Sequence, residues 1–251
     1  MGRIPRRYLL GEEGGWFHVT WKVHNDEYLL GEERVKQKYL ELLRRYKTRY
    51  GIKIVSYTIM DNHVHMTLYA PSLENLWRFM QVVNSVFARW YNKLVGRRGS
   101  LVRERYHASR IGWGWDIRWK YLLHAIIYDE TNAHKAGMTN GNIYKWSSAW
   151  ERGKGERYVI DDVPCEMKEE FGGKEGWERW WRGMVMEGGD RVKELGVDRT
   201  YALGEEVWVS RFYDEIRKKL GLKRGLVKHR RIDIEISRNV NELMSLIEVS
   251  G

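Results

Sequence analysis

The stretch Tyr57-Thr58-Ile59-Met60-Asp61-Asn62-His63-Val64-His65-Met66-Thr67-Leu68-Tyr69 carries the most structural information in this 251-residue chain. It predicts two strands, 52–59 and 62–70, joined at Asp61-Asn62 by a tight turn or a bulge. Side chains alternate between the faces of a strand, so His63 and His65 share one face with Cα atoms roughly 7 Å apart. Two imidazoles on one face can bind one metal ion, but paired histidines also occur at ordinary half-buried positions. A metal site therefore needs a third group.

The elements around this stretch are predicted from the spacing of apolar residues. Strands are expected at 15–23 and 101–111, and helices at 32–50, 73–95 and 116–132. Strand, helix, paired strands, helix and strand in this order predict an α+β fold, an antiparallel sheet with helices packed on one face.

Composition limits the partners and the compartment. Lys and Arg number 44 against 34 Asp and Glu, which gives a net charge of +10 and favours a polyanion such as nucleic acid. Cys165 is the only cysteine, so the chain forms no intramolecular disulfide and no thiolate zinc site. No apolar run is long enough to span a membrane or to form a signal-peptide core, so we expect a cytoplasmic protein with no membrane partner.

The helix at 116–132 carries the candidate third group. Tyr128 and Asn132 are four residues apart, which places both side chains on one helical face within about 6 Å. A nucleophile and a metal ligand can share that face. The other polar residues of the segment are expected in solvated or core positions (His124, His134) or on the helix surface (Asp129, Glu130).

Five segments follow one another in order between residues 18 and 150: Met60-Asp61-Asn62-His63-Val64-His65-Met66; Arg78-Phe79-Met80-Gln81-Val82-Val83-Asn84 with Trp90-Tyr91-Asn92; Arg97 to Tyr106; Tyr128-Asp129-Glu130-Thr131-Asn132-Ala133-His134-Lys135-Ala136-Gly137; and Tyr144-Lys145-Trp146-Ser147-Ser148. Through these segments the chain resembles the single-tyrosine HUH transposases, most closely the REP-associated tyrosine transposase branch, and also the insertion-sequence single-strand transposases. Asp61 and Ala133 stand where that family usually has proline.

This resemblance implies a ferredoxin-like HUH nuclease fold and a metal-dependent single-stranded DNA endonuclease and strand transferase. Tyr128 would be the catalytic nucleophile and form a 5′-phosphotyrosine. His63, His65 and Asn132 would bind the metal, Mg²⁺ or Mn²⁺, and zinc stays open as a third ion. The implied substrate is single-stranded DNA that contains a hairpin.

The chain is divided into two parts. We expect a catalytic domain, 1–150, and an appended, mostly helical region, 151–251, in which 232–249 is expected to form a strand and a helix. The appended region is interpreted as a nucleic-acid-binding module, and the alternative interpretation is a solvent-exposed run of charges without a partner.

Aromatic and basic side chains are expected to contact the DNA. Trp113 and Trp115 are candidates for base stacking. The expected DNA-binding residues are Arg97, Arg98, Arg103 and Arg105 near the site, and Lys228, Arg230 and Arg231 near the end of the chain.

Two other functional classes stay open. One is an HUH replication-initiation or relaxase-type nickase, which usually pairs its tyrosine with a lysine or a second tyrosine. The other is a domesticated, non-catalytic nucleic-acid-binding protein. The sequence also leaves open whether the protein is a monomer or a homodimer.

Overall fold

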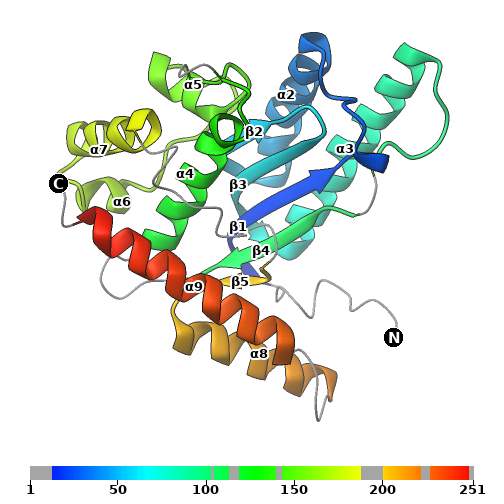
Figure 1. Cartoon of the computed structure of the whole chain (residues 1–251). Helices are drawn as coiled ribbons and strands as arrows, with labels where there is room; N and C mark the ends of the chain where they lie inside the picture. The colour runs from blue at the N-terminus through cyan, green and yellow to red at the C-terminus, as the bar shows by residue number, and fades with distance from the viewer. Residues whose placement is uncertain are drawn as a thin grey trace.

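The computed structural model describes residues 13–102, 105–112, 119–139, 143–187, 200–221 and 227–248 of the chain (Figure 1). The expected stacking residues Trp113 and Trp115 lie outside these ranges. In chain order the elements are β1 (Glu13–Lys22), η1 (His24–Asp26), α2 (Glu33–Lys47), η2 (Thr48–Tyr50), β2 (Lys53–Ile59), β3 (His63–Ser72), α3 (Leu73–Val95), β4 (His107–Ile111), α4 (Lys120–Lys135), α5 (Ser148–Lys154), α6 (Cys165–Glu169), α7 (Lys174–Glu187), β5 (Ala202–Leu203), α8 (Glu206–Leu220) and α9 (Val227–Glu248).

The described strands form one sheet in the order β2-β3-β1-β4-β5. The first four strands pair antiparallel, and their connections follow the β-α-β-β-α-β pattern of ferredoxin-like folds. The short β5 joins β4 in parallel at the edge of the sheet. The predicted α+β class is therefore confirmed, and the parallel edge strand is an addition that the sequence did not suggest.

The two faces of the sheet differ in chemistry. On β3, Val64, Met66 and Leu68 are fully buried in one core with side chains of α2 and α3. His65 and Thr67 occupy the alternate positions and contact side chains of α4. Helices therefore cover both faces of the sheet. The expectation that they lie on one face is wrong for α4, which packs on the polar face of β3.

The ends of α3 agree with the sequence prediction. The Ser72 hydroxyl accepts a hydrogen bond from the Asn75 backbone N–H at 3.1 Å, which caps the first turn. Gly96 ends the helix with φ at +68°, a left-handed conformation that glycine adopts without steric cost. Local chemistry at both ends therefore determines the length of α3.

The chain beyond residue 150 is mainly helical, as predicted. Trp177 and Trp181 of α7 and Val240 of α9 are buried in a second core with Ile126 and Ile127 of α4. The later helices therefore pack against the helix that carries the candidate nucleophile. The division of the chain at residue 150 stays a prediction.

A buried carboxylate attaches α9 to β5 and α8. Asp233 accepts hydrogen bonds from the backbone N–H groups of Tyr201 at 3.0 Å and Ala202 at 2.9 Å. It also accepts one from the Tyr213 hydroxyl of α8 at 2.6 Å. This single side chain joins three elements of the C-terminal region.

Two element predictions need correction. The strand expected at 101–111 begins only at His107, and Val102 forms an isolated bridge with Val23. The strand and helix expected at 232–249 are replaced by the single helix α9, because apolar residues such as Ile232 and Ile236 follow helical spacing. Within the described residues, no helix is long and apolar enough to cross a bilayer.

Candidate active site

A row of polar side chains crosses the face of the sheet that α4 covers. In the register of β1 against β3, Thr20 lies opposite His65 and His18 lies opposite Thr67. Period-two alternation keeps all these residues on the same face as His63. The row continues on the flanking strands with Ser56 and Thr58 of β2 and His107 and Ser109 of β4.

His63 and His65 lie side by side on β3. Their ring centroids are 4.8 Å apart with an interplanar angle of 82°. His65 is only 3% exposed, whereas His63 is partly exposed. The His63 Nδ1 atom lies 2.5 Å from Asn62 Oδ1. When Nδ1–H donates to this oxygen, the free lone pair of the imidazole is on Nε2, the arrangement of a metal-binding histidine with an outer hydrogen-bond partner.

Tyr128 of α4 lies against two of these histidines. Its ring centroid is 5.6 Å from that of His65 and 5.7 Å from that of His18, both in edge-on geometry. The Lys135 ammonium lies 5.1 Å from the centroid of the same ring. Tyr128 is 7% exposed, and the partly exposed Asn132 lies one helical turn further along α4. The structure thus brings the predicted nucleophile to the histidine face of the sheet.

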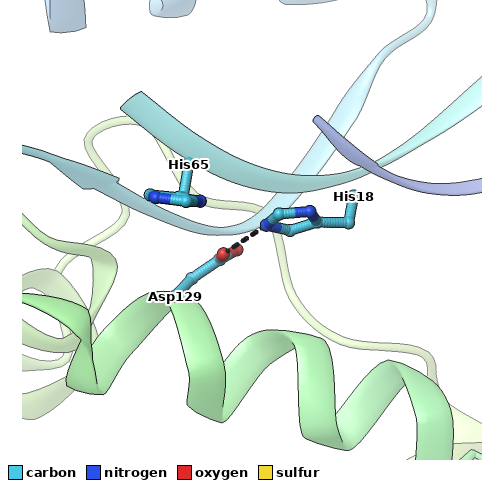
Figure 2. Close-up of side chains that lie close together, drawn as sticks. All are labelled: His18, His65 and Asp129. Carbon is cyan, nitrogen blue, oxygen red and sulfur yellow. Dashed lines mark hydrogen bonds and ion pairs between the residues drawn. The ribbon is translucent and has the colours of Figure 1, made fainter. Parts of the chain in front are cut away.

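Asp129 is the main correction to the sequence prediction, which placed it on the helix surface. Its side chain is fully buried and points from α4 into the polar row (Figure 2). His18 Nε2 donates to Asp129 Oδ1 at 3.0 Å, and the hydroxyls of Ser56 and Thr67 donate to Oδ2 at 2.6 and 2.7 Å. His18, His65 and Asp129 each offer a ligand atom, and these atoms lie within 4.8 Å of one another.

The environment keeps His65 and His124 neutral. Burial lowers the pKa of His65 well below 6.5, and the nearby His18, His63 and Lys135 lower it further. Burial also lowers the pKa of His124, to about 3. A neutral imidazole can bind a metal through its lone pair. Within the described part of the chain, His65 Nδ1 has no hydrogen-bond partner, so this atom is suited to bind a metal ion through its lone pair.

His124 and His134 lie where the sequence placed them, one in the core and one in solvent. Neither ring nitrogen of the buried His124 has a hydrogen-bond partner among the described residues. The exposed His134 places Nδ1 3.2 Å from the Thr139 hydroxyl. We therefore do not include either residue in the candidate site.

The sequence contains weak indications that His18 and Asp129 belong to the site. His18 alternates with the buried Phe17 and Val19, so it had to face the opposite side of β1. Asp129 follows Ile126 by three residues, which places it on the apolar stripe of α4. A polar residue on such a stripe needs a buried partner, and that partner is 111 residues away in the sequence.

Glu130, also expected on the helix surface, is buried on another side of α4. Its carboxylate accepts hydrogen bonds from Ser148 at 2.6 Å, from Arg152 at 3.1 and 3.3 Å, and from the Trp181 indole. Arg152 also donates to the Val55 backbone carbonyl of β2 at 2.6 Å. Asp129 and Glu130 therefore attach α4 to the sheet on one side and to α5 and α7 on another.

The predicted DNA-binding residues near the site follow the C-terminal end of α3. Arg97 is partly buried and lies 4.0 Å from Glu27, whereas Arg98 and Arg105 are exposed. The backbone of this segment meets the end of β1, because His24 N–H donates to the Leu101 carbonyl at 3.0 Å. That end of β1 also carries Lys22, which lies opposite His63. Arg103 lies outside the described residues.

The predicted basic residues of the C-terminal region lie in the first turns of α9. Lys228 and Arg231 are exposed, and Arg230 is partly buried and forms an ion pair with Asp214 at 3.2 Å. This start of the helix is near β5, because the His229 ring lies 5.4 Å from that of Tyr201.

Comparison with known proteins finds one family model that matches the N-terminal part of the chain. Residues 13–114 match the family model described as "Transposase IS200 like". The matched segment makes up about two fifths of the chain. Through this segment the chain is similar to the IS200-like transposases, which supports the family expected from the sequence. A search of curated proteins finds no match.

Two solved structures resemble this chain at low similarity. One is a REP-associated tyrosine transposase bound to a REP hairpin, with 16% identity and a TM-score of 0.45 over 65% of this chain and 93% of the other. The second is a putative transposase from Deinococcus radiodurans R1, with 18% identity and a TM-score of 0.33 over 43% of this chain and 81% of the other.

Proposed function

We propose that this chain is a transposase that cleaves and rejoins single-stranded DNA through a 5′-phosphotyrosine formed at Tyr128. The observation that carries the proposal is the position of Tyr128, edge-on to the rings of His65 and His18 on the polar face of the sheet. The matched family segment ends at residue 114, before Tyr128, so the nucleophile is assigned on this geometry together with the Tyr128–Asn132 motif.

The proposed metal site lies between β3 and α4. Neutral imidazoles and an amide oxygen are suitable ligands for Mn²⁺, and Mg²⁺ accepts them together with retained water. The unpartnered Nδ1 of the buried His65 supports the assignment, because an orphaned buried nitrogen is costly unless it gains a partner. The bound ion would neutralise the charge of the scissile phosphate. We propose His63, His65 and Asn132 as ligands and Mg²⁺, or Mn²⁺, as the ion.

The protein's own residues position the reacting groups. The Tyr128 phenolic oxygen forms a bond to phosphorus while the bond from phosphorus to the 3′-oxygen breaks. The leaving oxygen takes up a proton and becomes a free 3′-OH. Attack by the 3′-OH of another strand reverses these steps, so rejoining needs no ATP. The Lys135 ammonium lies 5.1 Å from the centroid of the Tyr128 ring, so a positive charge is close to the nucleophile.

The proposed substrate is single-stranded DNA with a hairpin beside the cleavage site. A net charge of +10 favours binding to phosphates. The exposed Arg98 and Arg105 belong to the segment that meets β1 near His63, so they are suited to bind the strand beside the site. Lys228 and Arg231 of α9 are proposed to contact a more distant part of the DNA.

The test is the formation of a covalent protein–DNA adduct. The full chain is incubated with Mg²⁺ or Mn²⁺ and single-stranded DNA that carries the flanking sequences of its own gene, and the product is denatured and resolved on a gel. Tyr128→Phe should remove the adduct. Tyr121→Phe is the matched control, because Tyr121 is a buried tyrosine of the same helix. An adduct of equal yield in Tyr128→Phe, or none in wild type, rejects the proposal.

A further inference from the structure

We propose that His18 and Asp129 bind the divalent cation together with His65, on the polar face of the sheet next to Tyr128. This inference rests on the proposed function for the role of the ion, and it adds two ligands that the sequence motif does not contain. Figure 2 shows the three side chains converging from β1, β3 and α4.

The spacing of the ligand atoms suits one ion. Two ligands about 2.1 Å from an ion lie about 3.0 Å apart when they are adjacent in an octahedral site and about 4.2 Å apart when they are opposite. His18 Nε2 and Asp129 Oδ1 are 3.0 Å apart, the adjacent spacing. Binding of the ion at Nε2 requires the imidazole proton to move to Nδ1, which has no hydrogen-bond partner among the described residues. The three ligand atoms lie within 4.8 Å of one another, so the group needs to contract by about half an ångström to bind an ion.

The carboxylate is oriented as a metal ligand. Ser56 and Thr67 both donate to Oδ2, which leaves Oδ1 directed toward His18. Outer hydrogen bonds of this kind fix the orientation of carboxylates that bind metals. Mg²⁺ prefers oxygen ligands, and Asp129 adds an anionic oxygen to a set that otherwise offers imidazoles and one amide.

The burial of the Asp129 carboxylate is a second reason to place a cation here. The Asp129 side chain is fully buried, and the partners of its carboxylate are one histidine and two hydroxyls. A buried carboxylate requires a compensating positive charge, and a divalent cation between Asp129 and His18 supplies it. His65 would bind the same ion through one of its ring nitrogens. Its Nδ1 atom has no hydrogen-bond partner among the described residues.

Manganese binding to the full chain tests the inference without DNA. Electron paramagnetic resonance titration with Mn²⁺ alone gives the dissociation constant. We expect Asp129→Asn and His18→Gln each to weaken binding at least about tenfold. Asp233→Asn is the matched control, because Asp233 is a buried carboxylate of the C-terminal region with its own partners at β5 and on α8. It should leave the constant unchanged within about twofold.

A second measurement counts the ligands of the bound ion directly, in wild type and in His18→Gln. Pulsed electron paramagnetic resonance of bound Mn²⁺ counts the coupled imidazole nitrogens, and His18→Gln should remove one of them. Unchanged affinity in both variants and an unchanged nitrogen count in His18→Gln would show that His18 and Asp129 form only a hydrogen-bonded pair.

The outcomes separate this inference from the proposed function. If Asp129→Asn binds Mn²⁺ as wild type does while Tyr128→Phe loses the DNA adduct, the extra ligands are wrong and the transferase proposal stands. If Asp129→Asn loses Mn²⁺ affinity but wild type forms no adduct, the metal site stands and the transferase proposal fails.

Discussion

Asp233 should make the stability of the fold depend on pH. Burial raises the pKa of its carboxyl from 3.8 to about 6, against the opposing effect of the hydrogen bonds from Tyr213, Tyr201 and Ala202. An acid with a raised pKa in the folded state favours folding below its unfolded pKa, and this contribution is lost as the pH rises through the folded pKa. The relevant window is therefore about pH 4 to 7.

The magnitude follows from the two pKa values. With a pKa of about 6 folded and 3.8 unfolded, the carboxyl stabilises the fold by about 1.4 kcal/mol at pH 5 and by almost nothing at pH 7.5. Asp233 is 1% exposed, so no reduction for solvent screening is needed. Asp233→Asn removes the titrating group and should reduce the difference in unfolding free energy between the two pH values by this amount.

Urea denaturation of wild type and variant at pH 5 and pH 7.5 measures the effect. The substitution also has a pH-independent cost from altered hydrogen bonds, so the quantity to compare is the change between the two pH values. Glu235→Gln removes an exposed carboxylate of the same helix and serves as control. If Asp233→Asn and wild type show the same pH dependence within about 0.4 kcal/mol, the raised pKa is wrong.

Three more expectations follow from the described contacts. Arg152→Met leaves the buried Glu130 carboxylate without its charge partner and should cost about 3–5 kcal/mol in urea denaturation, and a loss below about 1 kcal/mol would contradict the role of this pair. His124→Leu removes a histidine whose pKa falls from 6.5 to about 3, so the loss of stability between pH 7.5 and pH 5 should shrink by about 2 kcal/mol. Arg98→Glu and Arg105→Glu should weaken single-stranded DNA binding and flatten its dependence on salt in fluorescence anisotropy, and an unchanged salt slope would exclude phosphate contacts at these exposed positions.

The parts of the fold that the sequence predicted are those with local causes. Helix α3 follows from its apolar stripe, the Ser72 cap and Gly96. Strand β3 follows from strict alternation between Val64, His65 and Met66. The short β5 has only two residues and is determined by its pairing with β4, so its own sequence contains no periodic signal.

The sequence predicts only those residues of the site that belong to a recognisable motif. Tyr128 and the paired histidines have fixed spacings, so their approach could be expected before the structure. The partners of Asp129 come from three strands, 62 to 111 residues earlier in the chain. Helical spacing places Asp129 on the apolar stripe of α4, but it does not identify the partners of the carboxylate, because these are contributed by distant strands.

The two consecutive acids of α4 explain how one helix can hold a nucleophile in place. Successive residues of a helix point about 100° apart, so Asp129 and Glu130 reach different surroundings. Asp129 is bound by β1, β2 and β3, whereas Glu130 is bound by Ser148, Arg152 and Trp181. Tyr128 immediately precedes both acids, so a rotation of α4 that displaced its ring would break one set of contacts or the other. Arg152 and Trp181 lie beyond residue 150, so part of the support for the site belongs to the region that the sequence assigned to a separate module.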